Sequence, residues 1–171
     1  MSPLRRAQLG RELATSLVQA NRDLNVVIVS DDDDVESWAR TLSVQFLRES
    51  RPGLSQAVAT AHTELRAAGT PQMIVAHSDL ACASSLSWIA AFEGVTIAPD
   101  RRNEGTNVLA MATDVEFVFS YGPHSFGRHY RQALETGLAV RVVADRHCAN
   151  DLDAPSDLRL LRRHGTVPAS R

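Results

Sequence analysis

A buried strand is indicated by Met73-Ile74-Val75-Ala76, which runs directly into the polar residues His77-Ser78-Asp79. A short, continuous apolar run is typical of a strand covered on both faces. The other runs that we interpret as strands are residues 25–30, 43–47, 95–98, 106–112, 116–120 and 140–143. The segments with a helical pattern are residues 3–20, 54–68, 84–92, 125–136 and 155–163. Strands alternating with helices predict an α/β fold whose mostly parallel sheet is flanked by helices.

Length and composition predict one globular domain over residues 1–164, followed by a flexible tail at residues 165–171. All 18 basic side chains are arginine, so the chain as given has no lysine for Schiff-base or P-loop chemistry. The net charge of −2 argues against a nucleic-acid partner. The chain as given shows neither a secretory signal nor an apolar run long enough to span a membrane, so we expect a cytoplasmic protein without a membrane partner.

Carboxylates at strand ends are the first candidate site, because ligands of open α/β sheets bind beyond the carboxyl ends of strands. Asp79 can hold a divalent ion there or cap the following segment. In an extended backbone, Asp151 and Asp153 project to the same side, where a cation such as Mg²⁺ relieves their repulsion. In the competing interpretation, Asp153 caps the next helix and Asp151 is solvated.

Two loops are candidate anion sites. In residues 103–107, a glycine allows close approach of backbone N–H groups and Thr106 adds a hydroxyl, although a plain strand connection competes. In residues 121–129, Gly122 permits close approach, Ser125 can cap a helix, and Arg128 can reinforce an anion site at the helix start. The acidic run at residues 31–34 is interpreted as a solvated turn between a strand and a helix, and the histidines form no ligand cluster.

These stretches, taken in chain order, resemble one family. The motifs are His77-Ser78-Asp79-Leu80, Pro99-Asp100 through Gly105-Thr106-Asn107, Tyr121-Gly122-Pro123-His124-Ser125-Phe126-Gly127-Arg128-His129 and Asp151-Leu152-Asp153-Ala154-Pro155. Together they are similar to the guanylyltransferases of deazaflavin-coenzyme biosynthesis, which join GMP from GTP to 2-phospho-L-lactate or phosphoenolpyruvate. The resemblance implies a fold of the nucleotide-diphospho-sugar-transferase type and covers nearly the whole chain.

The resemblance also implies roles for individual residues. Catalytic carboxylates that bind Mg²⁺ are implied at Asp79, Asp151 and Asp153. Contacts to the phosphorylated acid are implied at Thr106, Gly122 and Ser125, and nucleotide contacts at Gly53, Leu54 and Ser55. Ser55 stands where the family has asparagine. We expect GTP and phosphoenolpyruvate as substrates, with pyrophosphate released.

One departure from the family concerns its first strand and the loop that binds the nucleotide phosphates. The chain as given starts with the helix at residues 3–20, so we expect this strand and loop to be missing from it. The alternatives are therefore a truncated, inactive homologue that binds only the acid, or another nucleotidyltransferase of the same fold.

Overall fold

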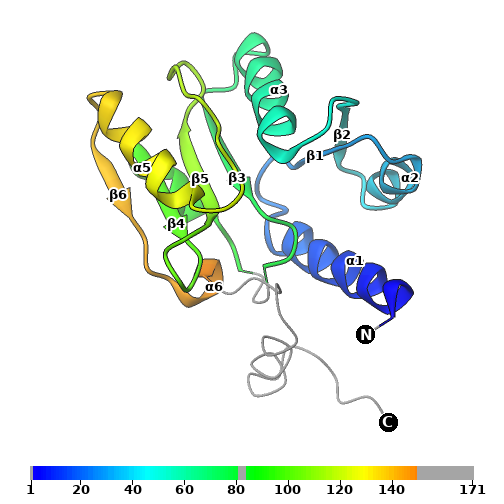
Figure 1. The fold of residues 1–171 in the computed structure, drawn as a ribbon. Coiled ribbons are helices and arrows are strands. Elements are labelled where there is room, and N and C mark those ends of the chain that lie inside the picture. The colour runs from blue at the N-terminus through cyan, green and yellow to red at the C-terminus, as the bar shows by residue number, and fades with distance from the viewer. Residues whose placement is uncertain (1, 81–83, 150–171) are drawn as a thin grey trace.

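A computed structural model describes residues 2–80 and 84–149 and shows an α/β domain with helices against its sheets (Figure 1). The helices are α1 Pro3–Ala20, α2 Asp33–Thr41, α3 Leu54–Ala67, α4 Ser87–Ala90, α5 Ser125–Glu135 and α6 Arg146–Ala149. The strands are β1 Val27–Ser30, β2 Gln45–Arg48, β3 Gln72–Ala76, β4 Val95–Pro99, β5 Thr106–Ala112 and β6 Val140–Val142. The α/β class is confirmed. The expected helix at 155–163, the tail and the Asp151–Asp153 pair lie outside the described residues.

The larger sheet corrects the expectation of mostly parallel pairing. Its strand order is β3-β5-β4-β6, and β5 is antiparallel to both β3 and β4, whereas β4 and β6 are parallel. Strands β3, β4 and β6 therefore run in one direction, with the reversed β5 inserted between two of them. The reason is the short loop at residues 100–105, since a connection of that length joins antiparallel neighbours and a parallel pair needs a long crossover.

The prediction of a strand at residues 116–120 is wrong, because this stretch pairs with no strand in the described part of the chain. Phe117 and Phe119 are buried while Glu116 and Val118 are exposed, which is the alternation of a strand. The two phenylalanines join the core through side-chain packing alone. Alternating burial thus arises here without a neighbouring strand.

The smaller sheet consists of β1 and β2, which are parallel with Val27 opposite Gln45. Among the described strands, β1 pairs only with β2, and β3 pairs only with β5. Helix α3 contacts both β1 and β3 and so connects the two sheets. Asp32 begins α2 by accepting the N–H groups of Asp34 and Val35, which confirms the turn expected at the acidic run.

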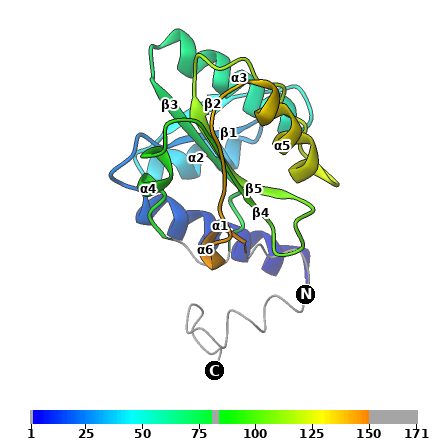
Figure 2. The same cartoon turned by 90° about the vertical axis from the view of Figure 1, so that its left-hand side faces the viewer.

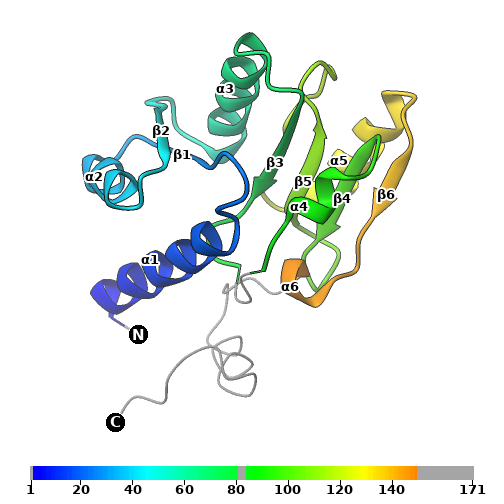
Figure 3. The same ribbon diagram turned by 180° about the vertical axis from the view of Figure 1, so that it is seen from behind.

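The core occupies both faces of the larger sheet. Helix α5 lies on one side of this sheet and α4 on the other (Figure 2). Ile97 and Leu109 face one cluster with residues of α3 and α5, whereas Ala98 and Val108 face the other with residues of α4 and α6. Figure 3 shows α4 and α6 from the side opposite α5. No helix in the described parts of the chain has the length and apolarity needed to cross a bilayer.

Candidate active site

Three stretches that are far apart in the sequence meet beside the start of β5. The N–H of Thr106 donates to Ser125 Oγ at 3.0 Å. The N–H of Tyr121 donates to Ser55 Oγ at 2.8 Å, and the rings of Tyr121 and His77 lie 5.5 Å apart. The structure therefore gathers the predicted acid residues, the predicted nucleotide stretch and the end of β3 at one place.

The predicted acid contacts divide into buried and exposed groups. Thr106 is 0% exposed and Ser125 is 2% exposed, whereas Gly122 is exposed. Ser125 does not cap its helix as expected, because its hydroxyl oxygen accepts from Thr106 and the residue before the helix is His124. Thr106 and Ser125 thus form a buried polar cluster, and the loop that contains Gly122 presents the accessible surface.

His129 belongs to this buried polar cluster. The sequence analysis did not identify it as a site residue. It is 0% exposed, and burial lowers its pKa to about 4, with smaller contributions from Arg128 and His77. The ring is therefore neutral at pH 7. Its Nε2 accepts the N–H of Ser120 at 2.9 Å, so the proton is on Nδ1, which donates to Thr106 Oγ1 at 3.0 Å. The available signal was its spacing of four residues from Ser125, which places both on one helical face.

The loop at residues 120–123 is fixed mainly through its backbone. The guanidinium of Arg128 donates to the carbonyl oxygens of Ser120 at 2.7 Å and Pro123 at 2.6 Å. Arg128, which was expected to reinforce an anion site at the helix start, therefore braces the loop through its carbonyl oxygens. Gly122 has φ +105°, and a Cβ there would meet no atom within 4 Å. The space above this glycine is open.

The residues predicted to contact the nucleotide, 53–55, lie at the start of α3. Gly53 precedes the helix with φ +105°, and Leu54 is 45% exposed. Just before them, Glu49 is buried and its pKa is lowered to about 2, mainly by hydrogen bonds from Arg51 and then from Thr60. This buried carboxylate fixes the chain that leads into α3 and was also missed, because a single glutamate after a strand carries no recognisable pattern.

The resemblance implies that the phosphorylated acid binds at this loop. On that expectation, Ser55→Ala should weaken acid binding by roughly threefold to tenfold, because the Tyr121 N–H loses a partner and such a bond contributes about 0.5–1.5 kcal/mol. Calorimetric titration with phosphoenolpyruvate measures the effect. The matched control is Ser16→Ala, since that hydroxyl only bonds the backbone within exposed α1. An unchanged affinity for the acid would contradict a role of Ser55 in holding the loop.

The loop at residues 100–105 is not an open anion site. The backbone N–H groups of Arg102, Glu104 and Gly105 all donate at 2.9 Å to the carboxylate of Asp100. The loop thus binds an anion from its own chain. The expectation that these amides bind an external anion is wrong, because Asp100 already occupies them.

Asp79 follows β3 by three residues, and of the three predicted metal ligands it alone belongs to the described part of the chain. Asn107 connects this region to α6, since its carbonyl accepts the His77 N–H and its Nδ2 donates to the Cys148 carbonyl, both at 3.0 Å. Carboxylate oxygens are ligands that Mg²⁺ prefers. Residues 2–80 and 84–149 contain no cluster of three potential ligands.

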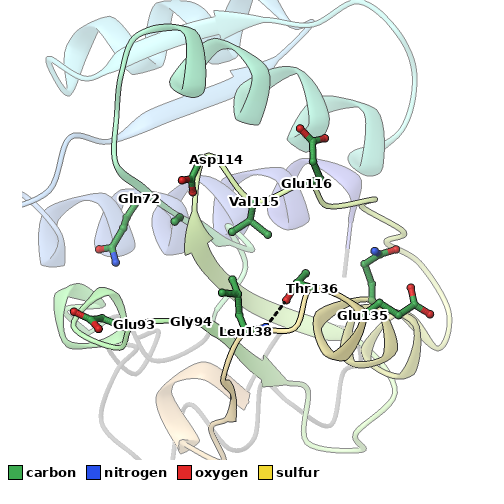
Figure 4. Close-up of a pocket in the computed structure, with 11 residues that line it drawn as sticks. Gln72, Glu93, Gly94, Asp114, Val115, Glu116, Glu135, Thr136 and Leu138 are labelled. Carbon is green, nitrogen blue, oxygen red and sulfur yellow. Dashed lines mark hydrogen bonds between the residues drawn. The ribbon is translucent and has the colours of Figure 1, made fainter.

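A hollow of about 740 Å³ lies at the opposite end of the sheet (Figure 4). It is lined by Gln72 at the start of β3, by Gly94 before β4 and by Leu138 before β6. Its acidic residues are Glu93, Asp114, Glu116 and Glu135. Negative side chains repel phosphate groups, so this hollow does not fit phosphorylated substrates.

The sheets flanked by helices define the class of the protein as an α/β domain, and its polar loops gather at one edge of the larger sheet, where ligands of such folds bind. A family model described as "Guanylyl transferase CofC like" matches residues 1–171, and the chain belongs to this family.

The chain is also similar to individual members with known names. It is 32% identical to a phosphoenolpyruvate guanylyltransferase of Rubrobacter xylanophilus, over 98% of this chain and 86% of that protein. It is 30% identical to the protein of the same name from Sphaerobacter thermophilus, over 91% of this chain and 78% of that protein. A 3-phospho-D-glycerate guanylyltransferase of Phenylobacterium zucineum is 28% identical to this chain, over 77% of this chain and 64% of that protein.

Proposed function

We propose that this protein transfers GMP from GTP to phosphoenolpyruvate. A phosphate oxygen of the acid forms a bond to the α-phosphorus of GTP, and the bond from that phosphorus to the α–β bridging oxygen breaks. The electron pair leaves with pyrophosphate, so no covalent enzyme intermediate is needed. The names of the relatives support the reaction and favour phosphoenolpyruvate over 2-phospho-L-lactate or 3-phosphoglycerate as the acid.

The observation that carries the proposal is the glycine loop at residues 120–123. Gly122 is exposed and has no side chain, so a phosphate group can approach the backbone there. Ser125 holds the loop directly, because its N–H donates to the Gly122 carbonyl at 3.0 Å, and Thr106 in turn donates to the Ser125 hydroxyl. We propose that the acid binds over Gly122, with Thr106 and Ser125 acting mainly by holding the surrounding backbone.

We propose that Asp79, Asp151 and Asp153 hold Mg²⁺, which when bound offsets the negative charge that develops on the transferred phosphate. The donor chemistry of three carboxylates suits this ion. A further support is Asn107, which binds residues close in sequence to Asp79 and Asp151. Gly53, Leu54 and Ser55 would lie beside the nucleotide.

A second candidate function is binding of the acid without transfer. It is favoured by the separate sheets, since β1 and β3 each lack a second partner among the described strands. In this second candidate, the protein would bind the acid more tightly than GTP and would release no pyrophosphate.

One experiment separates these functions. The protein is titrated with Mg²⁺ and each substrate in a calorimeter, and pyrophosphate release is measured with GTP plus each phosphorylated acid. We expect binding of phosphoenolpyruvate and release of pyrophosphate that depends on it. Acid binding without release would support the second candidate, and a folded sample that binds no phosphorylated acid would contradict both.

A further inference from the structure

His129 makes two hydrogen bonds to different parts of the site. It accepts the N–H of Ser120, two residues before Gly122, and donates to the Thr106 hydroxyl. Its ring packs edge-on against Tyr121, with the centroids 4.7 Å apart. Because His129 is fully buried, it cannot touch a ligand in this conformation, and any effect it has on binding must pass through its neighbours.

The bond to Ser120 completes the fixation of the loop. Tyr121 is held by Ser55, and Arg128 holds carbonyl oxygens on both sides of Gly122. The amide groups of the two residues before Gly122 thus have fixed partners, as do the carbonyls of Ser120 and Pro123. The Gly122 carbonyl also accepts the Ser125 N–H at 3.0 Å. The direction of the Gly122 N–H depends on the peptide that joins it to Tyr121, and the bonds of Ser120 and Tyr121 hold that peptide in place.

We propose that His129 is a positioning residue that holds Gly122 in the conformation that binds the phosphorylated acid, by accepting the Ser120 N–H on Nε2. This inference rests on the proposed acid site. The bond to Thr106 has a different task, since it keeps the proton on Nδ1 and leaves Nε2 free to accept. A merely structural histidine would affect folding and both substrates alike, whereas a positioning role is specific to the acid.

Two variants separate the bonds of His129. In His129→Gln, the side-chain oxygen reaches the place of Nε2 and can accept from Ser120, while the donor to Thr106 is lost. In His129→Asn, the amide nitrogen takes the place of Nδ1 and can donate to Thr106, while the acceptor for Ser120 is lost. We expect the dissociation constant for phosphoenolpyruvate to change less than threefold in His129→Gln and to rise about tenfold in His129→Asn. The dissociation constant for GTP should stay within threefold in both.

The calorimetric experiment has outcomes that overturn the inference in different ways. Equal acid affinities in the two variants, or equal losses for acid and GTP, would show that His129 acts only on stability. A wild-type protein that binds no phosphorylated acid would overturn the proposed function and this inference together. Nitrogen NMR of the wild-type histidines gives a test that needs no variant to fold. We expect the neutral ring to carry its proton on Nδ1, and a proton on Nε2 would overturn the assignment of the Ser120 bond.

Discussion

Replacing Asp79 by asparagine is expected to lower the rate of pyrophosphate release by roughly 10²–10³, the usual effect of removing one preorganised electrostatic contact to a transition state. Asparagine keeps the size of the side chain but removes its charge, so the variant should fold normally. Its rate is measured against wild type over a range of Mg²⁺ concentrations.

The matched control is Asp114→Asn. Asp114 is an exposed carboxylate at the acidic hollow, at the other end of the sheet, so its loss should leave the rate unchanged. A rate within a few-fold of wild type for Asp79→Asn would remove Asp79 from the metal site and support its alternative role as a cap. Equal losses in both variants would point to a general effect of net charge.

The second large effect is expected for Gly94→Ala, which should destabilise the fold by about 3 kcal/mol or more. A Cβ at Gly94 would overlap the carbonyl oxygen of Ala139 and lie 2.9 Å from Phe92 Cε1. That oxygen accepts the Val95 N–H at 2.9 Å, so it cannot move away without breaking a backbone bond where β4 and β6 begin to pair. The φ of +145° adds strain for any residue with a side chain.

Denaturant unfolding measures this change, with Gly10→Ala as the comparison. Gly10 lies inside α1, and a Cβ there meets no atom within 4 Å. Alanine at that position should stabilise the protein by about 0.5–1 kcal/mol, because it has the higher helix propensity. If the two variants unfold at the same denaturant concentration, the close approach at Ala139 does not constrain the fold.

The order of helices and strands was largely predictable from local patterns. The apolar run at Met73 and the helix starting at Pro3 were both confirmed, because burial and capping act on neighbouring residues. The reversed direction of β5 follows from the short loop before it, whereas the apolar runs alone favour a parallel sheet. The lack of pairing at Phe117 could not be predicted, because an alternating pattern reports burial of one face and not the presence of a neighbouring strand.

The candidate site was predictable as a set of stretches but not as a set of contacts. The sequence pointed to Thr106, Gly122 and Ser125, yet the accessible group is the glycine and the hydroxyls lie beneath it. Two further contacts depend on how the chain folds in space: the binding of backbone amides by Asp100, and the bonds that join His129 to both Ser120 and Thr106. Tertiary packing sets these distances, and they produce no periodic pattern in the sequence.

The separation of the two sheets has a consequence for motion in the native state. Two short strands form a marginal sheet by themselves, so β1 and β2 should open at a lower free energy than the larger sheet. Helix α3 contacts β1 and contains Ser55, whose hydroxyl accepts the Tyr121 N–H in the loop of Gly122. We expect fluctuations of the small sheet to reach the loop through α3. A ligand that reduces these fluctuations would then also order the proposed acid site, and the two events would be cooperative without a change in the average structure.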